Sequence, residues 1–249
     1  MSTCIFQVIS CQSLALAGLI VASIVGDLHG QEDFKRSGRF GLKPGEIITR
    51  PDKSQRWQDD LKVGAVAPEF TLPMLKLDNG NPITQSLGAA QASEVSLKEL
   101  RKQKPVVLVF GSITCPPFRN QLDGIDEVYD DFSDKANFLF IYVREAHPDS
   151  VLSIRDSEGI ESLQKIPQAA DAIERTQAAA YCQKSLDLKL PIAVDTVHND
   201  VGQAYAGWPN RMVVVDTSGE IIYAGEPSPG GTDAKRLRDW LTANIGEGN

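Results

Sequence analysis

The sequence predicts an α/β fold in which a central mixed sheet is flanked by helices and extended by strands on its N-terminal side. Residues 106–110 form a continuous β-branched and aromatic run, which is typical of a parallel strand buried on both faces. Residues 138–143 repeat this pattern, and residues 118–132 between the two runs carry apolar side chains at helical spacing. A strand, a helix and a strand in this order form a right-handed unit with two parallel strands.

The predicted elements before this unit are short. Residues 63–77 are expected to form an edge strand or a hairpin that turns at residues 78–80. Ser96 and Glu99 have the spacing of a capping box, which predicts a short helix over residues 96–100.

After this unit, the sequence predicts a loop, a helix and the remaining strands. Residues 148–166 have no sustained pattern and are expected to form an irregular loop. A long helix is expected from Pro167 to about Leu186. The last predicted elements are a strand at 192–195, a hairpin of residues 211–215 and 220–224, and a helix from Thr232 to Ile245.

The composition is that of an ordinary globular protein, with 42 % apolar and 23 % charged residues among 249. A net charge of -8 and the lack of a basic run argue against a nucleic-acid partner. Cys4 and Cys11 lie in the N-terminal segment, so a processed chain would keep Cys115 and Cys182. Two cysteines do not make a disulfide scaffold.

The N-terminus differs from the rest of the chain. Residues 4–26 contain no charged residue and are mostly apolar, so residues 1–30 are interpreted as a signal peptide or a membrane anchor. Either reading predicts a protein that is exported, periplasmic or extracytoplasmic, or anchored through this segment; a misassigned start codon is the third alternative. Residues 31–62 are polar and predict a linker with one short helix near residues 57–61, followed by a single domain over residues 63–246.

Cys115 is the candidate nucleophile. It follows the buried run 106–110 at the start of a predicted helix, and Thr114 stands where a helix cap is expected. Backbone N–H groups at a helix N-terminus favour a thiolate over a thiol, and open α/β sheets bind ligands at the carboxyl ends of their strands. The alternative is a cysteine that packs as a small buried hydrophobe.

Glu145 and His147 are two residues apart at the end of the next strand, so an extended backbone would turn both toward Cys115. An imidazole there would raise the thiolate content and exchange a proton near neutral pH. Glu145 would orient the ring, as a carboxylate does in a triad; otherwise His147 is a loop residue before a proline. Ser112 and Thr114 would hydrogen-bond the sulfur, or serve only the turn and the cap.

The order of elements resembles the thioredoxin-like fold with extra N-terminal strands. The opening G-x-x-A-P-x-F-x-L from Gly64 resembles the start of redoxin domains, peroxiredoxins included. Trp208 and Pro209 precede a strand at the place where this fold has a cis-proline loop that faces the reactive cysteine. X–Pro bonds are mostly trans, so the cis isomer is implied by the resemblance alone. The sequence C-P-P-F from Cys115 to Phe118 looks like the C-P-P-C of thiol reductases with its second cysteine replaced.

A longer match is to the iodothyronine deiodinases. The stretches F-G-S-I-T-C-P-P-F at 110–118 and F-L-F-I-Y-V-R-E-A-H-P at 138–148 resemble that family's F-G-S-C-T-U-P-P-F and F-L-x-x-Y-I-E-E-A-H-P, where U is selenocysteine. The likeness extends over about residues 100–245. It implies a thiol oxidoreductase of the thyroxine 5′-deiodinase type, in which Cys115 attacks the iodine of an iodinated phenol.

The resemblance also implies roles for individual residues. His147 and Glu145 would supply the proton to the ring carbon, and Tyr142, otherwise a core aromatic, would relay a proton or contact the substrate. Cys182 is a possible resolving thiol, with inert packing as the alternative. The residues expected to bind substrate are Arg211, Trp208, Pro209 and Phe118.

This chain departs from the family pattern at several positions. Cys115 replaces selenocysteine, so slower turnover is expected, while Ile113 and Arg144 replace a cysteine and a glutamate. Residues 167–169 read Pro-Gln-Ala and lack the histidine of the family's P-x-H, which leaves Arg211 as one half of a substrate clamp.

No cofactor or metal is expected, because no clustered ligands have zinc-site spacing. The expected partners are a small halogenated phenol or thiol substrate and an external thiol or thioredoxin-like reductant, and a homodimer stays open. One alternative is a thiol peroxidase or disulfide reductase, although peroxiredoxins place their threonine three positions before the cysteine and Thr114 directly precedes Cys115. The other alternative is a non-catalytic, exported redoxin-like binding domain.

Overall fold

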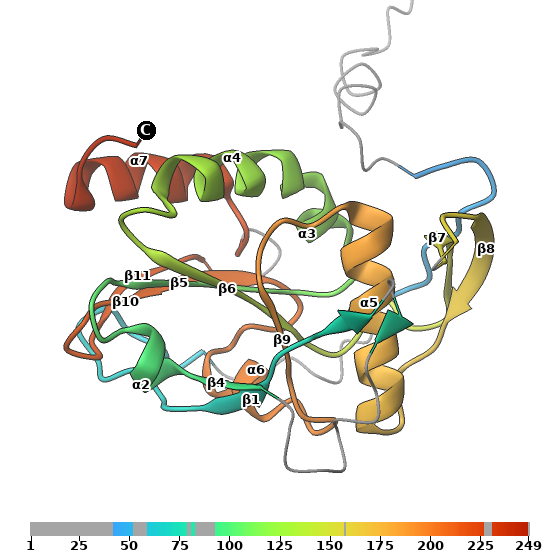
Figure 1. Ribbon diagram of the computed structural model, residues 1–249, viewed down its shortest axis with the longest axis horizontal. Coiled ribbons are helices and arrows are strands. Elements are labelled where there is room, and N and C mark those ends of the chain that lie inside the picture. The colour runs from blue at the N-terminus through green and yellow to red at the C-terminus, as the bar shows by residue number, and fades with distance from the viewer. Residues whose placement is uncertain are drawn as a thin grey trace, which may run out of the picture.

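The structure is a computed structural model, and it describes residues 42–51, 59–78, 81–82, 93–156, 158–226 and 231–248. Its centre is a five-stranded sheet with the order β11-β10-β5-β6-β9 (Figure 1). The strands are β5 (Val106–Gly111), β6 (Asn137–Tyr142), β9 (Ile192–Val194), β10 (Arg211–Val215) and β11 (Ile221–Ala224).

The sheet is mixed. β5 pairs in parallel with β6, and β6 pairs in parallel with β9. β10 lies antiparallel to both β5 and β11. Every residue of β5 is buried, as a strand covered on both faces requires. This strand order and direction confirm the predicted thioredoxin-like α/β fold.

Alternate residues of the central strands face two separate cores. Val107 and Val109 face the side covered by α3 (Pro116–Asn120), α4 (Leu122–Phe132), α5 (Ala172–Leu186) and α7 (Ala234–Ile245). Val106 and Leu108 face the side covered by the N-terminal strands, α2 (Leu97–Leu100) and α6 (Asp200–Ala204). Figure 1 shows α4 and α7 side by side on one face of the sheet. Both faces of the sheet are therefore covered, so a functional site is expected at the ends of the strands.

The N-terminal extension consists of short strands. β1 (Thr71–Pro73) pairs antiparallel with β4 (Glu94–Ser96), and β2 (Leu77–Asp78) pairs with β3 (Asn81–Pro82). The Ser96 hydroxyl accepts a 3.2 Å hydrogen bond from the Glu99 N–H, which confirms the predicted cap of α2.

The expected loop over residues 148–166 is wrong. These residues contain the antiparallel hairpin of β7 (Ser150–Arg155) and β8 (Glu161–Ile166). Leu152 and Ile154 are buried while their neighbours are more exposed, which is the period of a strand with one covered face. α5 covers that face.

The start of α5 also differs from the prediction. The helix begins at Ala172 and not at Pro167, because the Asp171 carboxylate caps it by accepting a 2.9 Å hydrogen bond from the Glu174 N–H. Of the short helix expected near residues 57–61, residues 57–58 lie outside the described residues and residues 59–61 are not helical.

Within the described ranges, none of the helices is long and apolar enough to cross a membrane. Residues 1–30 lie outside those ranges, so the signal peptide or anchor stays a prediction.

Candidate active site

Cys115 lies where β5 passes into α3, and it is the N-cap residue of that helix. Its side chain is buried, with 1 % of the residue exposed. The Sγ atom accepts a 3.3 Å hydrogen bond from Asn210 Nδ2, and the Thr232 hydroxyl donates to the other end of that amide at 2.6 Å. Asn210 follows the Trp208–Pro209 peptide, which is cis. The predicted cis-proline loop therefore faces the cysteine.

The prediction of a Cys115 thiolate is wrong for this state of the chain. Burial raises the pKa of the Cys115 thiol to about 11, which outweighs the lowering by hydrogen bonds from the Phe118 N–H and Asn210. The negative charge of Glu145 raises the same pKa further. α3 is only five residues long, so its N-terminus offsets little of the desolvation. The resting sulfur is a neutral thiol.

Glu145 joins the end of β6 to the loop before α3. One carboxylate oxygen, Oε2, accepts from the Thr114 hydroxyl at 2.5 Å and from the Thr114 N–H at 3.3 Å. The other oxygen accepts a short hydrogen bond from the Tyr142 hydroxyl. Burial raises the pKa of Glu145 and of Tyr142. These residues form a buried unit that can hold a proton close to the cysteine, and we call it the Tyr142–Glu145–Thr114 unit.

The expected pairing of Glu145 with His147 is not formed. His147 Nδ1 lies 2.7 Å from the carbonyl oxygen of Thr49, and since a carbonyl only accepts, this nitrogen carries the proton. Nε2 is then the nitrogen that can take up a proton. The ring faces the N-terminal segment because Thr114 and Tyr142 already occupy Glu145.

Two hydroxyls expected near the sulfur are used elsewhere. The Ser112 hydroxyl accepts a 3.2 Å hydrogen bond from the Ala146 N–H, and the Thr114 hydroxyl also accepts from the His147 N–H at 3.2 Å. Thr114 is not the helix cap, since Cys115 occupies that position without a side-chain cap bond. Both hydroxyls instead tie the Cys115 loop to the residues after β6.

Arg211 is bonded within the chain. Its guanidinium binds Asp59 through two nitrogens, at 2.8 and 3.1 Å, and donates to the carbonyls of Gly225 at 3.0 Å and Tyr205 at 3.2 Å. Only 2 % of the residue is exposed. This arrangement stabilises the β10–β11 region and places the guanidinium inside the protein, which disagrees with its expected role in a substrate clamp.

The other residues expected to bind substrate are mostly part of the core. Phe118 stacks on Phe140 with ring centroids 4.8 Å apart and an interplanar angle of 6°, and it is buried. Trp208 is also buried, while Pro209 is half-buried beside it. Among these residues, Pro209 is the one left with a partly open surface near the sulfur.

A comparison with protein families identifies the chain. A model of the iodothyronine deiodinase family matches residues 54–245, which include Cys115 and Glu145. The protein belongs to the iodothyronine deiodinase family.

Curated deiodinases from vertebrates are similar to this family member. The thyroxine 5-deiodinase of Rattus norvegicus is 33 % identical over 223 residues, covering 89 % of this chain and 59 % of the relative. That of Sus scrofa is 33 % identical over 141 residues, covering 57 % and 44 %. The type II iodothyronine deiodinase of Mus musculus is 27 % identical over 194 residues, covering 74 % and 70 %. The chain spans about half the length of the thyroxine 5-deiodinases that it matches.

Solved structures give a weaker match. A putative thiol:disulfide interchange protein DsbE from Chlorobium tepidum aligns with a TM-score of 0.48 and 16 % identity, over 75 % of this chain and all of that one. A hypothetical protein from Sinorhizobium meliloti gives 0.49 and 16 %, over 75 % and 86 %. The fold assignment of this deiodinase-family chain rests on its own strand order and on the cis-proline loop.

Cys182 of the deiodinase-family chain lies on α5 and is fully buried. Cys115 and Cys182 are both free thiols, and burial raises the pKa of Cys182. Its role as a resolving thiol stays a prediction. In the part of the chain that the structure describes, no group of three or more His, Cys, Asp or Glu side chains is arranged to hold a metal ion.

Two residues of the site were not predicted from the sequence. Asn210 stands beside the cis-proline and bonds the sulfur; its position next to Pro209 was the available signal. Arg175 is fully buried on α5, donates to the Val197 carbonyl at 3.2 Å, and acts electrostatically on Glu145. A charged residue within the alanine-rich helix was the signal for Arg175.

Alkylation of Cys115 is expected to be slow at neutral pH. With a pKa of about 11, the thiolate fraction at pH 7 is roughly 10⁻⁴, so the rate with iodoacetamide should rise about tenfold per pH unit from pH 7 to 10. Peptide mass spectrometry assigns the label to Cys115, and urea-unfolded chain is the control for an ordinary thiol. A rate that levels off below pH 9 would contradict the buried neutral thiol.

The stack of Phe118 on Phe140 is expected to couple the Cys115 turn to β6. Phe118→Leu and Phe140→Leu should each lower the free energy of unfolding by about 1 kcal/mol. In urea unfolding, the double variant should lose less than the sum of the two, with a coupling of about 0.5–1.5 kcal/mol. Strict additivity would show that the ring contact contributes nothing beyond burial.

Proposed function

We propose that this deiodinase-family chain is a thiol-dependent reductive dehalogenase that removes iodide from an iodinated phenol through Cys115. Family membership and the thioredoxin-like fold support a redox function of this kind. The observation that carries the proposal is the place of Cys115, which lies at the end of β5, facing the cis-proline loop. By the resemblance of residues 110–118 it would stand where the family has selenocysteine, and Glu145 lies close enough to act on its pKa.

The proposed reaction has two half-reactions that balance. In the first, the sulfur attacks iodine, the carbon–iodine bond breaks, and the ring carbon takes a proton: ArI + Cys115–SH gives ArH + Cys115–SI. In the second, two molecules of an external thiol reduce the adduct: Cys115–SI + 2 RSH gives Cys115–SH + RSSR + HI. The phenol is reduced and the external thiol is oxidised to a disulfide.

The neutral resting thiol supplies the proton that the ring carbon needs. As the sulfur bonds to iodine, its proton leaves, and the Tyr142–Glu145–Thr114 unit, in which Tyr142 and Glu145 have raised pKa values, can carry it. His147 Nε2 is a second acceptor at the same edge of the sheet. General acid catalysis of this kind contributes about 10²–10⁴-fold to a rate.

An external small thiol or a thioredoxin-like protein is proposed as the reductant, with no resident cofactor or metal. The names of the similar vertebrate proteins include thyroxine. For this chain the proposed substrate class is an iodinated phenol. The product of the assay reports the ring position at which the carbon–iodine bond is cleaved. Residues 1–30 are proposed to export the protein or to anchor it.

Iodide release tests the function. Purified full-length chain is incubated with 3,5-diiodotyrosine or thyroxine and dithiothreitol, and iodide and the deiodinated product are measured. Parallel reactions measure hydrogen peroxide consumption and insulin disulfide reduction. We expect thiol-dependent iodide release to exceed both other activities. Turnover of peroxide or insulin without iodide release would support the peroxidase or disulfide-reductase alternative instead.

The buried thiol favours a second candidate, a non-catalytic binding domain. A cysteine that is 1 % exposed with a pKa of about 11 is inert unless a ligand changes its surroundings. The two candidates differ in one observation. A catalytic chain consumes the Cys115 thiol when the iodinated phenol is added without reductant, and a binding domain keeps it.

A further inference from the structure

A small cavity lies beside the Cys115 turn, between the N-terminal segment, α3, β7 and the C-terminal end of α5. Its volume is about 150 Å³. This is below the roughly 300–1,000 Å³ of sites that enclose a whole drug-sized ligand, so it fits only one end of such a molecule. Among its lining residues are Lys43, Ile113, Arg119, Leu152, Arg155 and Asp187.

Arg119 lies at the base of this cavity, with only 6 % of its side chain exposed. Its Nη2 atom is 3.4 Å from Glu46 Oε2. Among the residues that the structure describes, Nε and Nη1 of Arg119 have no hydrogen-bond partner. A buried donor without a partner is unfavourable, and more so when the group is charged. The guanidinium therefore has unused capacity for an anion.

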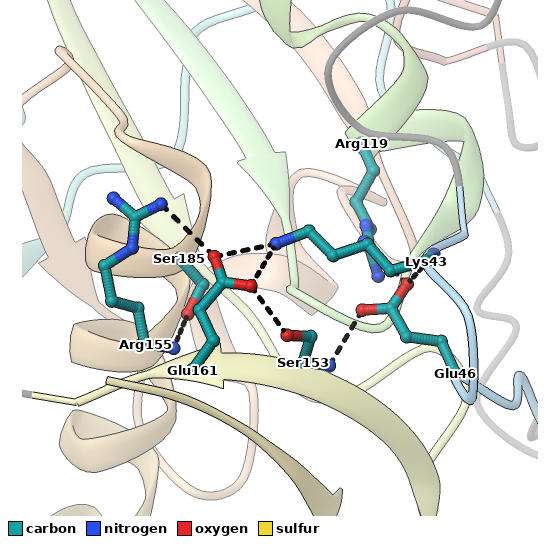
Figure 2. Close-up of polar contacts among 7 residues, drawn as sticks. All are labelled: Lys43, Glu46, Arg119, Ser153, Arg155, Glu161 and Ser185. Carbon is teal, nitrogen blue, oxygen red and sulfur yellow. Dashed lines mark hydrogen bonds and ion pairs between the residues drawn. The ribbon is translucent and has the colours of Figure 1, made fainter. Parts of the chain in front are cut away.

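Glu46 does not use up that capacity. Its carboxylate is fully buried, and its two oxygens accept backbone hydrogen bonds of 2.8 Å from Ser153 and Lys43. Figure 2 shows this carboxylate between the Lys43 backbone and Ser153, with Arg119 reaching down from α3. Glu46 is thus held in place by the chain and leaves two nitrogens of Arg119 for another acceptor.

Two more cations stand at the mouth. Lys43 Nζ is 2.9 Å from both oxygens of Glu161, and Arg155 Nη2 is 3.3 Å from one of them (Figure 2). The side chains of Lys43, Arg155 and Glu161 are 38 %, 46 % and 40 % exposed. Exposed ion pairs of this kind contribute little to stability, so an incoming anion can readily take the place of Glu161.

We propose that this cavity binds the carboxylate of a small organic acid, with Arg119 at its base and Lys43 and Arg155 at its mouth. Charge-assisted hydrogen bonds to arginine and lysine are the strong ones in proteins. The apolar side chains of Ile113 and Leu152 would contact the carbon next to the carboxylate. Asp187 also lines the cavity. Its negative charge would repel ligands that carry negative charges besides the bound carboxylate.

The place of the cavity connects it to the reactive sulfur. Ile113 and Arg119 flank Cys115 in the chain, and the Arg119 N–H donates to the Cys115 carbonyl at 3.0 Å. Arg211, the other arginine considered for a ligand, is already bonded to Asp59 and to two carbonyls. The identity of the ligand rests on the proposed function: the carboxylate would belong to the iodinated substrate or to the thiol reductant.

Paired acids and amides test the site without turnover. Isothermal titration of the full chain carrying Cys115→Ser uses 3-(3,5-diiodo-4-hydroxyphenyl)propionate and its amide, then 3-mercaptopropionate and its amide. We expect at least one acid to bind tenfold or more tighter than its amide. Arg119→Gln should reduce that preference to less than twofold, and Arg119→Lys should keep part of it. The first pair reports a substrate carboxylate and the second a reductant carboxylate.

Lys235→Gln is the matched control, since it removes an exposed cation on α7 and should keep the full preference. If thermal unfolding shows that Arg119→Gln does not fold, the Lys43→Gln/Arg155→Gln variant replaces it and should lower the preference at least threefold. Equal binding of each acid and its amide, or a preference that these variants leave unchanged, would overturn the proposal. A chain that prefers acids but releases no iodide would instead refute the proposed function and leave this site standing.

Discussion

Replacing Cys115 with serine is expected to lower kcat/KM for iodide release by at least about 10³-fold. Without its nucleophile the covalent mechanism cannot proceed. The residual rate then comes only from substrate binding and from the surrounding polar groups. The change exchanges one buried small side chain for another, so the fold should persist. The measurement is the initial rate of iodide release with dithiothreitol over a range of iodinated phenol concentrations from below to above KM.

Cys182→Ser is the matched control, because Cys182 is the other free, buried thiol among the described residues. If Cys182 only packs inside α5, its variant should retain activity within about threefold. A large loss that a higher dithiothreitol concentration restores would assign Cys182 the resolving role. Full activity in Cys115→Ser would refute Cys115 as the nucleophile.

Replacing Arg211 with methionine is expected to lower the free energy of unfolding by about 3 kcal/mol. The change removes the bidentate partner of Asp59 and leaves the buried carbonyls of Tyr205 and Gly225 without a donor. Breaking a buried ion pair by removing one partner typically costs about 3–5 kcal/mol. Because Asp59 keeps 24 % of its side chain exposed, the lower end of that range applies.

Urea unfolding measures this loss, and Arg236→Met is the matched control. Arg236 is 61 % exposed and 3.6 Å from Glu226, so its variant should change stability by less than about 0.5 kcal/mol. If Arg211→Met instead left stability unchanged and raised the KM for the iodinated phenol, Arg211 would be a substrate residue after all.

The sheet could be predicted from the sequence because its signals are local. Val106 to Phe110 is apolar at every position, as a doubly covered parallel strand must be. The cis-proline loop was found through its place before β10. The β7–β8 hairpin was missed, since its outer strand is polar at most positions and its inner face depends on packing against α5.

The chemistry of the site could be predicted less well. The positions of Cys115 and Glu145 follow from strand ends, which residue spacing indicates. The protonation state of the sulfur depends on how completely other segments cover it, and the partner of Glu145 depends on side-chain directions after the strand. Neither is a local property of the chain, so the thiolate and the Glu145–His147 pair were both predicted wrongly.

The most direct test of Cys115 as the nucleophile is a single turnover without reductant. The full chain is mixed with an excess of the iodinated phenol in the absence of any thiol, quenched, and examined for product and for modified cysteine by peptide mass spectrometry. We predict one equivalent of deiodinated phenol per chain and the loss of one thiol, located at Cys115. Deiodinated product with the Cys115 thiol intact, or no product while thiol-supported turnover proceeds, would contradict the account.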